Sequence, residues 1–588
     1  MENNTPFTPL QRFFRLLQLD KRDIYYVYVY GVFAGLISLS LPLGIQAVIG
    51  LIAGGSLSAS LILLVAAVTV ATALSGVLVI MQLTVTETIQ RRIFARSAFE
   101  FAYRIPRLRL SAMTRVYGPE LVNRFFDTLT VQKGIPKILI DLSTAALSII
   151  FGLILIAFYH PFFAFFGLSL ILVLFIIFRI TGPRGLSTSL RESKYKYEVA
   201  HWLEELARTM NTFKLWGDTP LSLKKTDYLV CNYLDNRHQH FRILLTQYGA
   251  ILAFKVVVTA SLLFLGSFLV IDNQINIGQF VAAEIVVILM LSSVEKLILS
   301  MDVIYDMLTA LEKLGNVTDL PLDENEGLRF EEIDTGKGII LEVRDLYFKY
   351  EDAESPTIDH LSMSVASGER VCITGYNRSG KSTLIQIIAG LYGEFQGSIS
   401  YNGIPMRNIE LSSLRRHIGD YCSEEDLFKG TVLENISLGN PDITMDQIVW
   451  AVNCIGLSEY IKRLPNGYNT VLLPGGKNVP QSVRTKIILA RSLAKKPRLH
   501  ALEGFWASLE PEDREAIATF LTAPEHDWTL LIVSDDPIIA SKCDRVLIIK
   551  DGKIVKAGSF EEIQQSPHFR KVFKVSEAES LHTGNGNS

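Results

Sequence analysis

The chain has 588 residues, of which 49% are hydrophobic and 20% are charged, with a mean hydropathy of +0.28 and a net charge of -3. This length exceeds that of one compact domain, so several domains are expected. The composition indicates a large part that faces hydrocarbon, joined to an ordinary water-soluble part. The slightly negative charge argues against a nucleic-acid-binding protein, which is usually basic.

Residues 1–22 are predicted to form the first element. Apolar and basic residues alternate at helical spacing from Pro6 onward. Because a helix with this pattern has one apolar and one charged face, we expect an amphipathic elbow helix. Such a helix lies along the inner surface of a membrane.

A transmembrane domain is predicted over residues 23–312. Six of its segments are long and apolar enough to cross a bilayer, which takes about 20 apolar residues. They lie near residues 24–52, 58–86, 137–159, 162–181, 246–271 and 276–305. The connections after the second and fourth segments are long and rich in Arg and Lys, whereas the other three are short and contain neither. The positive-inside rule therefore places both termini in the cytoplasm, and the long inner connections predict helices that continue beyond the membrane.

Two charged residues, Lys255 and Glu295, lie inside the fifth and sixth apolar segments. If these segments form an antiparallel hairpin that turns near Gln274, the two side chains reach a similar depth. A lone charge in hydrocarbon is costly, so charges there usually pair or line a polar path. Two interpretations stay open: an ion pair or snorkelling side chains, and direct contact with a transported substrate.

The composition changes abruptly after the last apolar segment. Residues 313–338 are acidic and polar, and we predict a linker. From 339 to 572, short β-rich runs alternate with helical patterns, which indicates an α/β domain with a largely parallel sheet. The polar tail, 573–588, is expected to be disordered.

A glycine-rich loop lies between an apolar run at 370–374 and a helical pattern at 384–389. It matches G-x-x-x-x-G-K-[ST], in which backbone N–H groups and a helix N-terminus hold phosphate oxygens. The lysine reaches the β and γ phosphates, and the next hydroxyl ligates Mg²⁺. We therefore predict a site for ATP and Mg²⁺. The predicted contacts are Gly375, Tyr376, Asn377, Arg378, Ser379, Gly380, Lys381, Ser382 and Thr383.

Six spans followed by such a loop resemble a half-transporter of the ABC exporter type, over residues 8–572. Further motifs that carry the resemblance lie at 117–127, 343–350, 427–436, 467–470, 488–493 and 544–554. The resemblance implies an all-α six-helix transmembrane domain plus an α/β P-loop nucleotide-binding domain with a helical subdomain. It also implies that Tyr350 stacks on adenine, and that the chain pairs in a lipid bilayer with a second half-transporter, as a homodimer or a heterodimer.

The same motifs show where the chain departs from the family. Ser423 replaces the glutamine of the Gln loop, and Gly504 replaces the glutamate that polarises the attacking water. Asp535 replaces the switch histidine. Glu503 replaces the Walker B aspartate and could still hold Mg²⁺ through water, together with Ser382. The signature Leu-Ser-Gly-Gly-Gln, which contacts the γ-phosphate bound by the opposite subunit, becomes Val479, Pro480, Gln481, Ser482 and Val483.

These departures predict a subunit that binds ATP but hydrolyses it poorly or not at all. Phosphoryl transfer needs an oriented water and charge stabilisation in addition to bound phosphate. Each composite site joins one P-loop to the signature of the partner. Because this chain has faults in both parts, efficient hydrolysis at two sites is not expected with any partner.

Two alternatives stay open. The first is an active exporter in which Glu510 or Asp535 replaces the missing base, and the second is a regulatory membrane protein that moves no substrate. The expected location is the plasma or inner membrane. The sequence does not identify the transported substrate, and no nucleic acid is expected as a partner.

Overall fold

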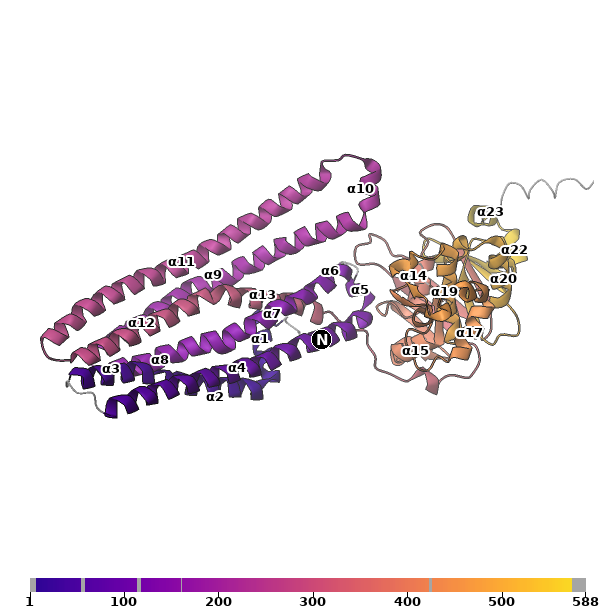
Figure 1. Cartoon of the computed structure of the whole chain (residues 1–588). Coiled ribbons are helices and arrows are strands. Elements are labelled where there is room, and N and C mark those ends of the chain that lie inside the picture. Colours follow the sequence, from indigo (N-terminus) through magenta and orange to yellow (C-terminus); the bar gives the residue numbers. More distant parts are fainter. Residues whose placement is uncertain (1–6, 54–58, 114–117, 160, 422–425, 574–588) are drawn as a thin grey trace, which may run out of the picture. The chain divides into compact units, whose positions relative to one another are not determined.

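The computed structural model describes residues 7–53, 59–113, 118–159, 161–421 and 426–573. The chain divides into two compact units: Met1–Leu108 with Ala112–Pro321, and Arg109–Ser111 with Leu322–Ser588. Figure 1 shows long helices in the first unit and a mixed α/β fold in the second. Residues 1–6 of the predicted elbow, Ser423, and the predicted tail beyond Phe573 lie outside the described residues.

The first unit contains helices and no named strand in its described residues. Among the residues that the structure describes, six stretches are long and apolar enough to cross a membrane, which agrees with the predicted number of spans. The helices are α1 (Pro9–Leu19), α2 (Lys21–Ser38), α3 (Ser40–Ala53), α4 (Ala59–Arg104), α6 (Gly118–Asn123), α7 (Asp127–Pro136), α8 (Ser143–Ala157), α9 (Pro161–Arg208), α10 (Met210–Trp216), α11 (Leu221–Ile271), α12 (Ile277–Leu299) and α13 (Met301–Thr318). A π-helical segment, Lys137–Leu142, joins α7 to α8. The short helix α5 (Leu110–Met113) begins in residues that are assigned to the second unit and ends in residues of the first.

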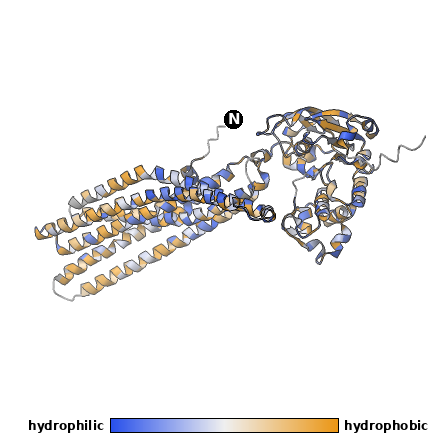
Figure 2. Cartoon of the chain, turned by 90° about the horizontal axis from the view of Figure 1, so that it is seen from above, coloured by the Kyte–Doolittle hydropathy of each residue, from blue (hydrophilic) through white to orange (hydrophobic). Residues whose placement is uncertain are grey.

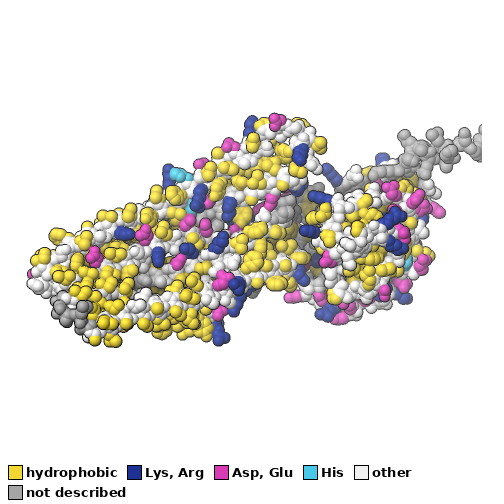
Figure 3. All heavy atoms as spheres, viewed as in Figure 1, with side chains coloured by type: hydrophobic (Ala, Val, Ile, Leu, Met, Phe, Trp, Pro, Cys, Tyr) yellow, Lys and Arg dark blue, Asp and Glu magenta, His cyan; other side chains and the backbone are white. Residues whose placement is uncertain are grey.

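Three helices are much longer than a bilayer requires. The helices α4, α9 and α11 have 46, 48 and 51 residues. At about 1.5 Å per residue each is roughly 70 Å long or more, against about 30 Å of hydrocarbon. In Figure 2, hydrophobic residues dominate the left end of this unit, and polar residues become frequent toward its other end. Figure 3 likewise shows hydrophobic side chains over most of that left end.

Two helix boundaries in this unit have clear physical causes. The first span consists of two helices, because α2 ends at Ser38 and α3 begins at Ser40. Pro42 explains the break, since a proline ring clashes with the carbonyl four residues earlier. Near the other end of the unit, α13 continues to Thr318, so the predicted start of the linker at 313 falls inside a helix. Val317 is fully buried, and apolar packing therefore holds this last turn.

The helix α1 lies within the predicted elbow and is anchored on α13. Thr8 and Gln11 form a capping box at its start, and Phe13 is buried. The Arg12 guanidinium donates to the Asp319 carboxylate beside the end of α13, with 3.0 Å between Nη1 and Oδ1. Gly315 leaves space for this side chain, since a Cβ there would lie 2.2 Å from Cζ of Arg12.

Glycines allow close packing between the apolar helices. A Cβ on Gly152 of α8 would lie 2.7 Å from Cγ of Met290 on α12. A Cβ on Gly266 of α11 would lie 2.3 Å from the Phe280 ring, also on α12. Because lipid is as apolar as these side chains, close contact at small residues is what holds such helices together.

The second unit is an α/β domain. Its strands are β1 (Leu341–Phe348), β2 (Ile358–Val365), β3 (Arg370–Gly375), β4 (Gln396–Tyr401), β5 (Ile404–Pro405), β6 (Ile418–Tyr421), β7 (Gly430–Thr431), β8 (Val471–Leu472), β9 (Leu499–Glu503), β10 (Thr529–Val533), β11 (Arg545–Lys550) and β12 (Lys553–Gly558). Its helices are α14 (Lys381–Ile388), α15 (Leu411–His417), α16 (Val432–Ser437), α17 (Met445–Cys454), α18 (Ser458–Arg463), α19 (Gln481–Ala494), α20 (Pro511–Leu521), α21 (Pro537–Ser541), α22 (Phe560–Gln564) and α23 (Phe569–Val572).

The larger sheet has six strands in the order β12-β11-β3-β10-β9-β6, and every neighbouring pair is parallel except β11 with β12. A second, antiparallel sheet has the order β2-β1-β4-β5. The helices α16 to α19 share an apolar core that includes Ile436, Val452, Ile461 and Ile488. This arrangement confirms the predicted α/β fold with a helical subdomain.

The parallel strands of the larger sheet end at the same edge, and three of them, β3, β10 and β9, are neighbours there. Val533 of β10 pairs with Ile373 of β3 on one side and with Glu503 of β9 on the other. The segments that follow the three strands therefore leave from neighbouring positions. Ligands bind at the carboxyl ends of strands in sheets of this kind, so this edge is the first place to look for a site.

A side chain at Gly152 should destabilise the helix bundle. In Gly152→Val the new atoms would overlap Met290 and force α8 and α12 apart, whereas Gly76→Val on α4 meets open space. We expect the first variant to lower the unfolding temperature of the detergent-solubilised protein by several degrees and the second to leave it nearly unchanged. Equal melting of the two variants would contradict the packing role of Gly152.

Candidate functional site

The loop between β3 and α14 has the backbone that phosphate binding requires. Gly375 has φ +152° and Gly380 has φ +94°, values that a residue with a side chain rarely adopts. A Cβ would lie 2.0 Å from the Ile549 carbonyl oxygen at Gly375 and 2.5 Å from the Thr357 carbonyl oxygen at Gly380. Gly380 caps α14 directly, so the first N–H groups of that helix are available to an anion.

The Lys381 amine lies over this loop. It donates to the carbonyl oxygens of Gly375 at 3.1 Å and Tyr376 at 2.7 Å, and it is 3.4 Å from the Ser379 hydroxyl. Burial lowers the pKa of Lys381, while the negative charges of Glu503 and Asp535 raise it. The amine is therefore held at the loop, within the electrostatic reach of both carboxylates.

Ser382 and Glu503 are joined directly. The Ser382 hydroxyl donates to Oε1 of Glu503, and Oε2 of Glu503 is buried without a hydrogen-bond partner among the described residues. Burial raises the pKa of Glu503, and the Ser382 hydrogen bond and Lys381 oppose that rise. A buried carboxylate oxygen beside a hydroxyl, next to a phosphate cradle, suits a Mg²⁺ ion that also binds phosphate oxygens.

The remaining residues of the loop have different surroundings. Ser379 and Thr383 are buried, whereas Asn377 and Arg378 are exposed. The Tyr376 hydroxyl is 3.2 Å from Nδ1 of His568. The residues present therefore fit a nucleotide phosphate chain with Mg²⁺, in which Lys381 and the loop N–H groups would hold phosphate.

Tyr350, the predicted adenine contact, lies next to the start of α14. Its hydroxyl is 3.1 Å from the Thr383 hydroxyl, and its ring meets the rings of Phe348 and Tyr392 edge-on. The side chain is half-buried, so it is placed beside the phosphate loop. Its stacking on adenine stays a prediction.

The positions that depart from the family pattern have distinct geometries. Gly504 follows β9 with φ +77°, and a Cβ there would meet no atom within 4 Å. Asp535 follows β10 and Ser534, whose N–H donates to the Ile373 carbonyl at 3.1 Å. This places Asp535 beside the end of β3. Ser423 lies outside the described residues.

The segment in place of the signature begins α19. Pro480 is the N-cap residue and offers no side-chain hydrogen bond to the helix. Pro480 and Gln481 are exposed, Val479 and Ser482 are partly buried, and Val483 packs in the core of the helical subdomain. Proline has no N–H, so the start of this helix has one backbone donor fewer than a serine would give it.

The intramembrane charges Lys255 and Glu295 are brought together between α11 and α12. The Lys255 amine is 3.2 Å from Oε2 of Glu295, and the Tyr248 hydroxyl is 3.2 Å from Oε1. Both Glu295 oxygens therefore have a donor. This arrangement supports the ion-pair interpretation and leaves the question of substrate contact untouched.

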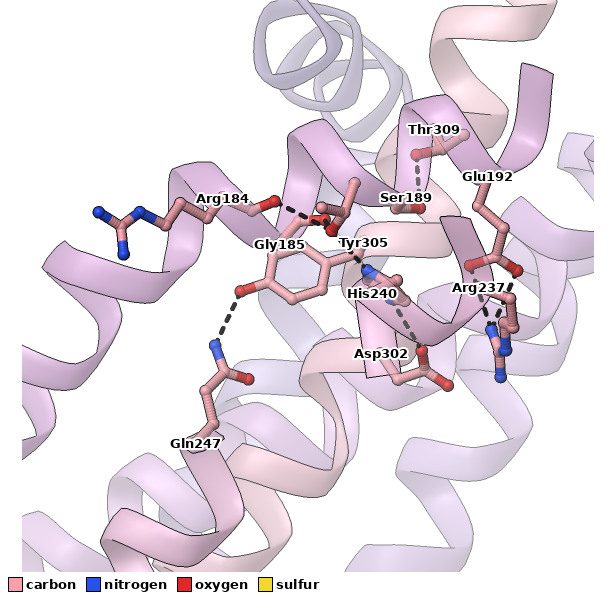
Figure 4. A network of polar contacts seen from close by, with 11 residues as sticks. Arg184, Gly185, Ser189, Glu192, Arg237, His240, Gln247, Asp302, Tyr305 and Thr309 are labelled. Carbon is pink, nitrogen blue, oxygen red and sulfur yellow. Dashed lines mark hydrogen bonds and ion pairs between the residues drawn. The ribbon is translucent and has the colours of Figure 1, made fainter. Parts of the chain in front are cut away.

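A polar network that sequence reasoning missed joins α9, α11 and α13 (Figure 4). His240 is fully buried on α11, with Nδ1 2.9 Å from the Thr188 hydroxyl on α9 and Nε2 3.3 Å from Oδ1 of Asp302 on α13. Three residues before His240 on α11, the Arg237 guanidinium donates to the Glu192 carboxylate of α9 at 3.1 Å. Three helices are thus tied by directional bonds.

The same network continues to Gln247, which lies about two turns beyond His240 on the same face of α11. Its Nε2 donates to the hydroxyls of Thr181 at 2.7 Å and Tyr305 at 3.0 Å, and Gly185 leaves space for the Tyr305 ring. A signal for these residues was present in the sequence. His240 and Gln247 are seven residues apart, and buried Ile251 continues the same helical face.

Comparisons with known proteins match both units. The family described as ABC transporter transmembrane region matches residues 24–294, and the family described as ABC transporter matches residues 358–503. A solved structure of a bacterial Atm1-family ABC exporter with ATP bound resembles the chain with a TM-score of 0.80. It covers 97% of this chain and 99% of its own, at 17% sequence identity, so this likeness concerns the fold.

Curated relatives are more similar over shorter stretches. The uncharacterized ABC transporter ATP-binding protein YfiB of Bacillus subtilis is 30% identical over 45% of this chain and 45% of its own. The alpha-hemolysin translocation ATP-binding protein HlyB of Escherichia coli is 26% identical over 62% and 51%. An ATP-dependent lipid A-core flippase of Legionella pneumophila is 28% identical over 51% of each chain. The chain thus spans about half the length of the curated relatives it matches.

Removing one charge of the intramembrane pair should cost more stability than removing both. Lys255→Met leaves the Glu295 carboxylate in an apolar setting without its ion partner, and Glu295→Gln leaves the amine alone. In a double-mutant cycle of melting temperatures in detergent, we expect the double variant to lose less than either single variant, and so clearly less than the sum of the two single losses. Additive losses would contradict a direct pair.

Proposed function

Because this chain belongs to the ABC transporters, we propose that it is one half of a dimeric exporter whose nucleotide-binding domain binds ATP but hydrolyses it slowly or not at all. It is an integral membrane protein, and its described residues include six apolar spans. The observation that carries the proposal is the contrast at the sheet edge. Lys381 and Ser382 occupy the positions that grip phosphate and metal, while Gly504 offers no side chain where the base would stand.

Each remaining departure from the family pattern would weaken the contacts that stabilise a γ-phosphate. Asp535 brings a carboxylate instead of a hydrogen-bond donor, and Pro480 removes an N–H from the helix start that would face the partner's nucleotide. An oriented water and its base are together worth about 10²–10⁴-fold in rate. Without them, bound ATP acts by holding the domains in one state rather than by being consumed.

The partner is a second half-transporter, identical or different. Nucleotide at residues 375–383 would favour association of the two nucleotide-binding domains and so bias the helices between inward and outward openings. The Arg- and Lys-rich inner connections support cytoplasmic termini, in a plasma or inner membrane. The transported substrate stays open.

An active exporter is the second candidate, and one observation favours it. The charge of Asp535 reaches Lys381, so a carboxylate stands near the phosphate end of the site. If Asp535 orients water there, hydrolysis would survive the loss of the usual base.

The Lys381 amine should dominate nucleotide binding. We expect Lys381→Ala to weaken ATP binding by the full-length protein at least about tenfold, because the contact of a partly buried charge with phosphate is lost. Lys556→Ala, which removes an exposed amine from β12, should leave the affinity unchanged. Binding can be measured by displacement of a fluorescent nucleotide, and full affinity in Lys381→Ala would contradict the proposed site.

The double variant Gly504→Glu/Asp535→His tests whether the residues at these two positions limit ATP hydrolysis. With the water-polarising carboxylate and the donor restored, ATP hydrolysis should rise at least about tenfold above wild type. Gly504→Gln/Asp535→His is the matched control, since it carries the same left-handed backbone strain at residue 504 without a base. The measurement is phosphate release by the purified chain. Steady wild-type turnover that is lost in Asp535→Asn would favour the active exporter instead.

A further inference from the structure

The carboxy-terminal segment, residues 566–573, reaches the phosphate loop. The Tyr376 hydroxyl lies 3.2 Å from Nδ1 of His568, although 192 positions separate the two residues in the chain. Their rings also meet edge-on, with 6.3 Å between the centroids. Tyr376 is the second residue of the loop, and His568 is the N-cap residue of α23. A segment outside the phosphate-binding pattern therefore contacts the loop directly.

Apolar packing holds this segment in place. Val572 and Phe573 are buried in a core that includes Ile548 of β11. The Tyr376 ring packs against the same core. The His568 carbonyl accepts the Val572 N–H at 3.2 Å, so the histidine is attached to a firmly packed turn. Its imidazole can therefore serve as a fixed partner for the tyrosine hydroxyl.

The main chain of Tyr376 in turn holds the Lys381 amine. Its carbonyl accepts from Nζ at 2.7 Å, and also from the Ser379 N–H at 3.3 Å. Its own N–H donates to the Ile549 carbonyl at 3.2 Å. Because the side chain and the carbonyl belong to one residue, the position of the Tyr376 ring helps to set the direction of the carbonyl that the amine uses.

The hydrogen bond to His568 adds direction to the packing of this ring. A bond between a hydroxyl and a ring nitrogen requires a defined position of both atoms, which an apolar contact does not. The next two residues, Asn377 and Arg378, are exposed. The bond is thus made just before the loop turns toward solvent, where an anchor restricts the loop most.

We propose that His568 is a positioning residue for nucleotide binding, which acts through Tyr376 on the Lys381 amine. The inference rests on the proposed function, because it assumes that the loop binds nucleotide. It makes the carboxy-terminal segment a part of the nucleotide site. Without the bond, the loop would have to be ordered when the nucleotide binds, and the cost of that ordering would lower the affinity.

The test measures ATP binding by the full-length protein in detergent, by displacement of a fluorescent nucleotide. The variants His568→Leu and His568→Asn carry side chains of similar shape, but only the amide can hydrogen-bond to the tyrosine hydroxyl. We expect His568→Leu to weaken ATP binding about fivefold, as the loss of one hydrogen bond would, and His568→Asn to stay within about twofold of wild type. Gln564→Leu, an exposed change in α22, is the control and should leave the affinity unchanged.

Two further measurements separate positioning from a general loss of structure. Tyr376→Phe removes the hydroxyl and keeps the packed ring, so it should weaken ATP binding about as much as His568→Leu, and the two changes together should weaken it no further. In the Lys381→Ala background, His568→Leu should have no additional effect, because the amine through which it acts is gone. Melting temperatures without nucleotide show that each variant is folded.

The outcomes distinguish this inference from the proposed function. If folded wild-type protein binds no ATP, the proposed function fails and the inference fails with it. If wild type binds ATP, the inference alone is overturned by any of three results. These are wild-type affinity in Tyr376→Phe, equal losses in His568→Leu and His568→Asn, and an undiminished effect of His568→Leu in the Lys381→Ala background. If His568→Leu does not fold, the comparison of Tyr376→Phe with wild type still decides.

Discussion

The parallel register of β3, β9 and β10 is the constraint on which the candidate site depends. Hydrogen bonds between these strands place the phosphate loop, Glu503 and Asp535 at one edge, although they are far apart in the chain. Buried strands such as β9 and β10 cannot shift in register without exposing apolar residues and unpairing backbone groups. A nucleotide bound at the phosphate loop would therefore meet the side chains that this edge presents.

That edge carries the side chains that would hold phosphate and metal, together with Gly504 and Asp535, the two positions there that depart from the family pattern. The positive-φ glycines, the α14 N-terminus, Lys381 and Ser382 form a cradle whose N–H groups, amine and hydroxyl suit an anion with a bound metal. Gly504 has no side chain, and Asp535 has a carboxylate, which accepts hydrogen bonds and does not donate them when it is ionised.

The helical unit uses two kinds of contact along α11. Toward the apolar end, Gly266 lies close to Phe280 of α12, and Leu262 is buried. Close packing is expected there, because the hydrophobic effect does not drive helices together in lipid. Toward the other end, His240 and Gln247 replace apolar contacts with hydrogen bonds to α9 and α13. Such bonds require defined partners, so they fix the helices in one register at the end from which α9 and α11 extend beyond the apolar zone.

The amino-acid sequence by itself determined the spans and the phosphate loop, since hydrophobic length and the spacing of Gly375, Gly380 and Lys381 are local patterns. It also pointed to Lys255 and Glu295 as a pair. Only the tertiary structure decided that Ser382 bonds Glu503, that Gly504 is left-handed, and that His240 links three helices. These facts depend on strand register and helix packing, which bring together residues that no local pattern relates.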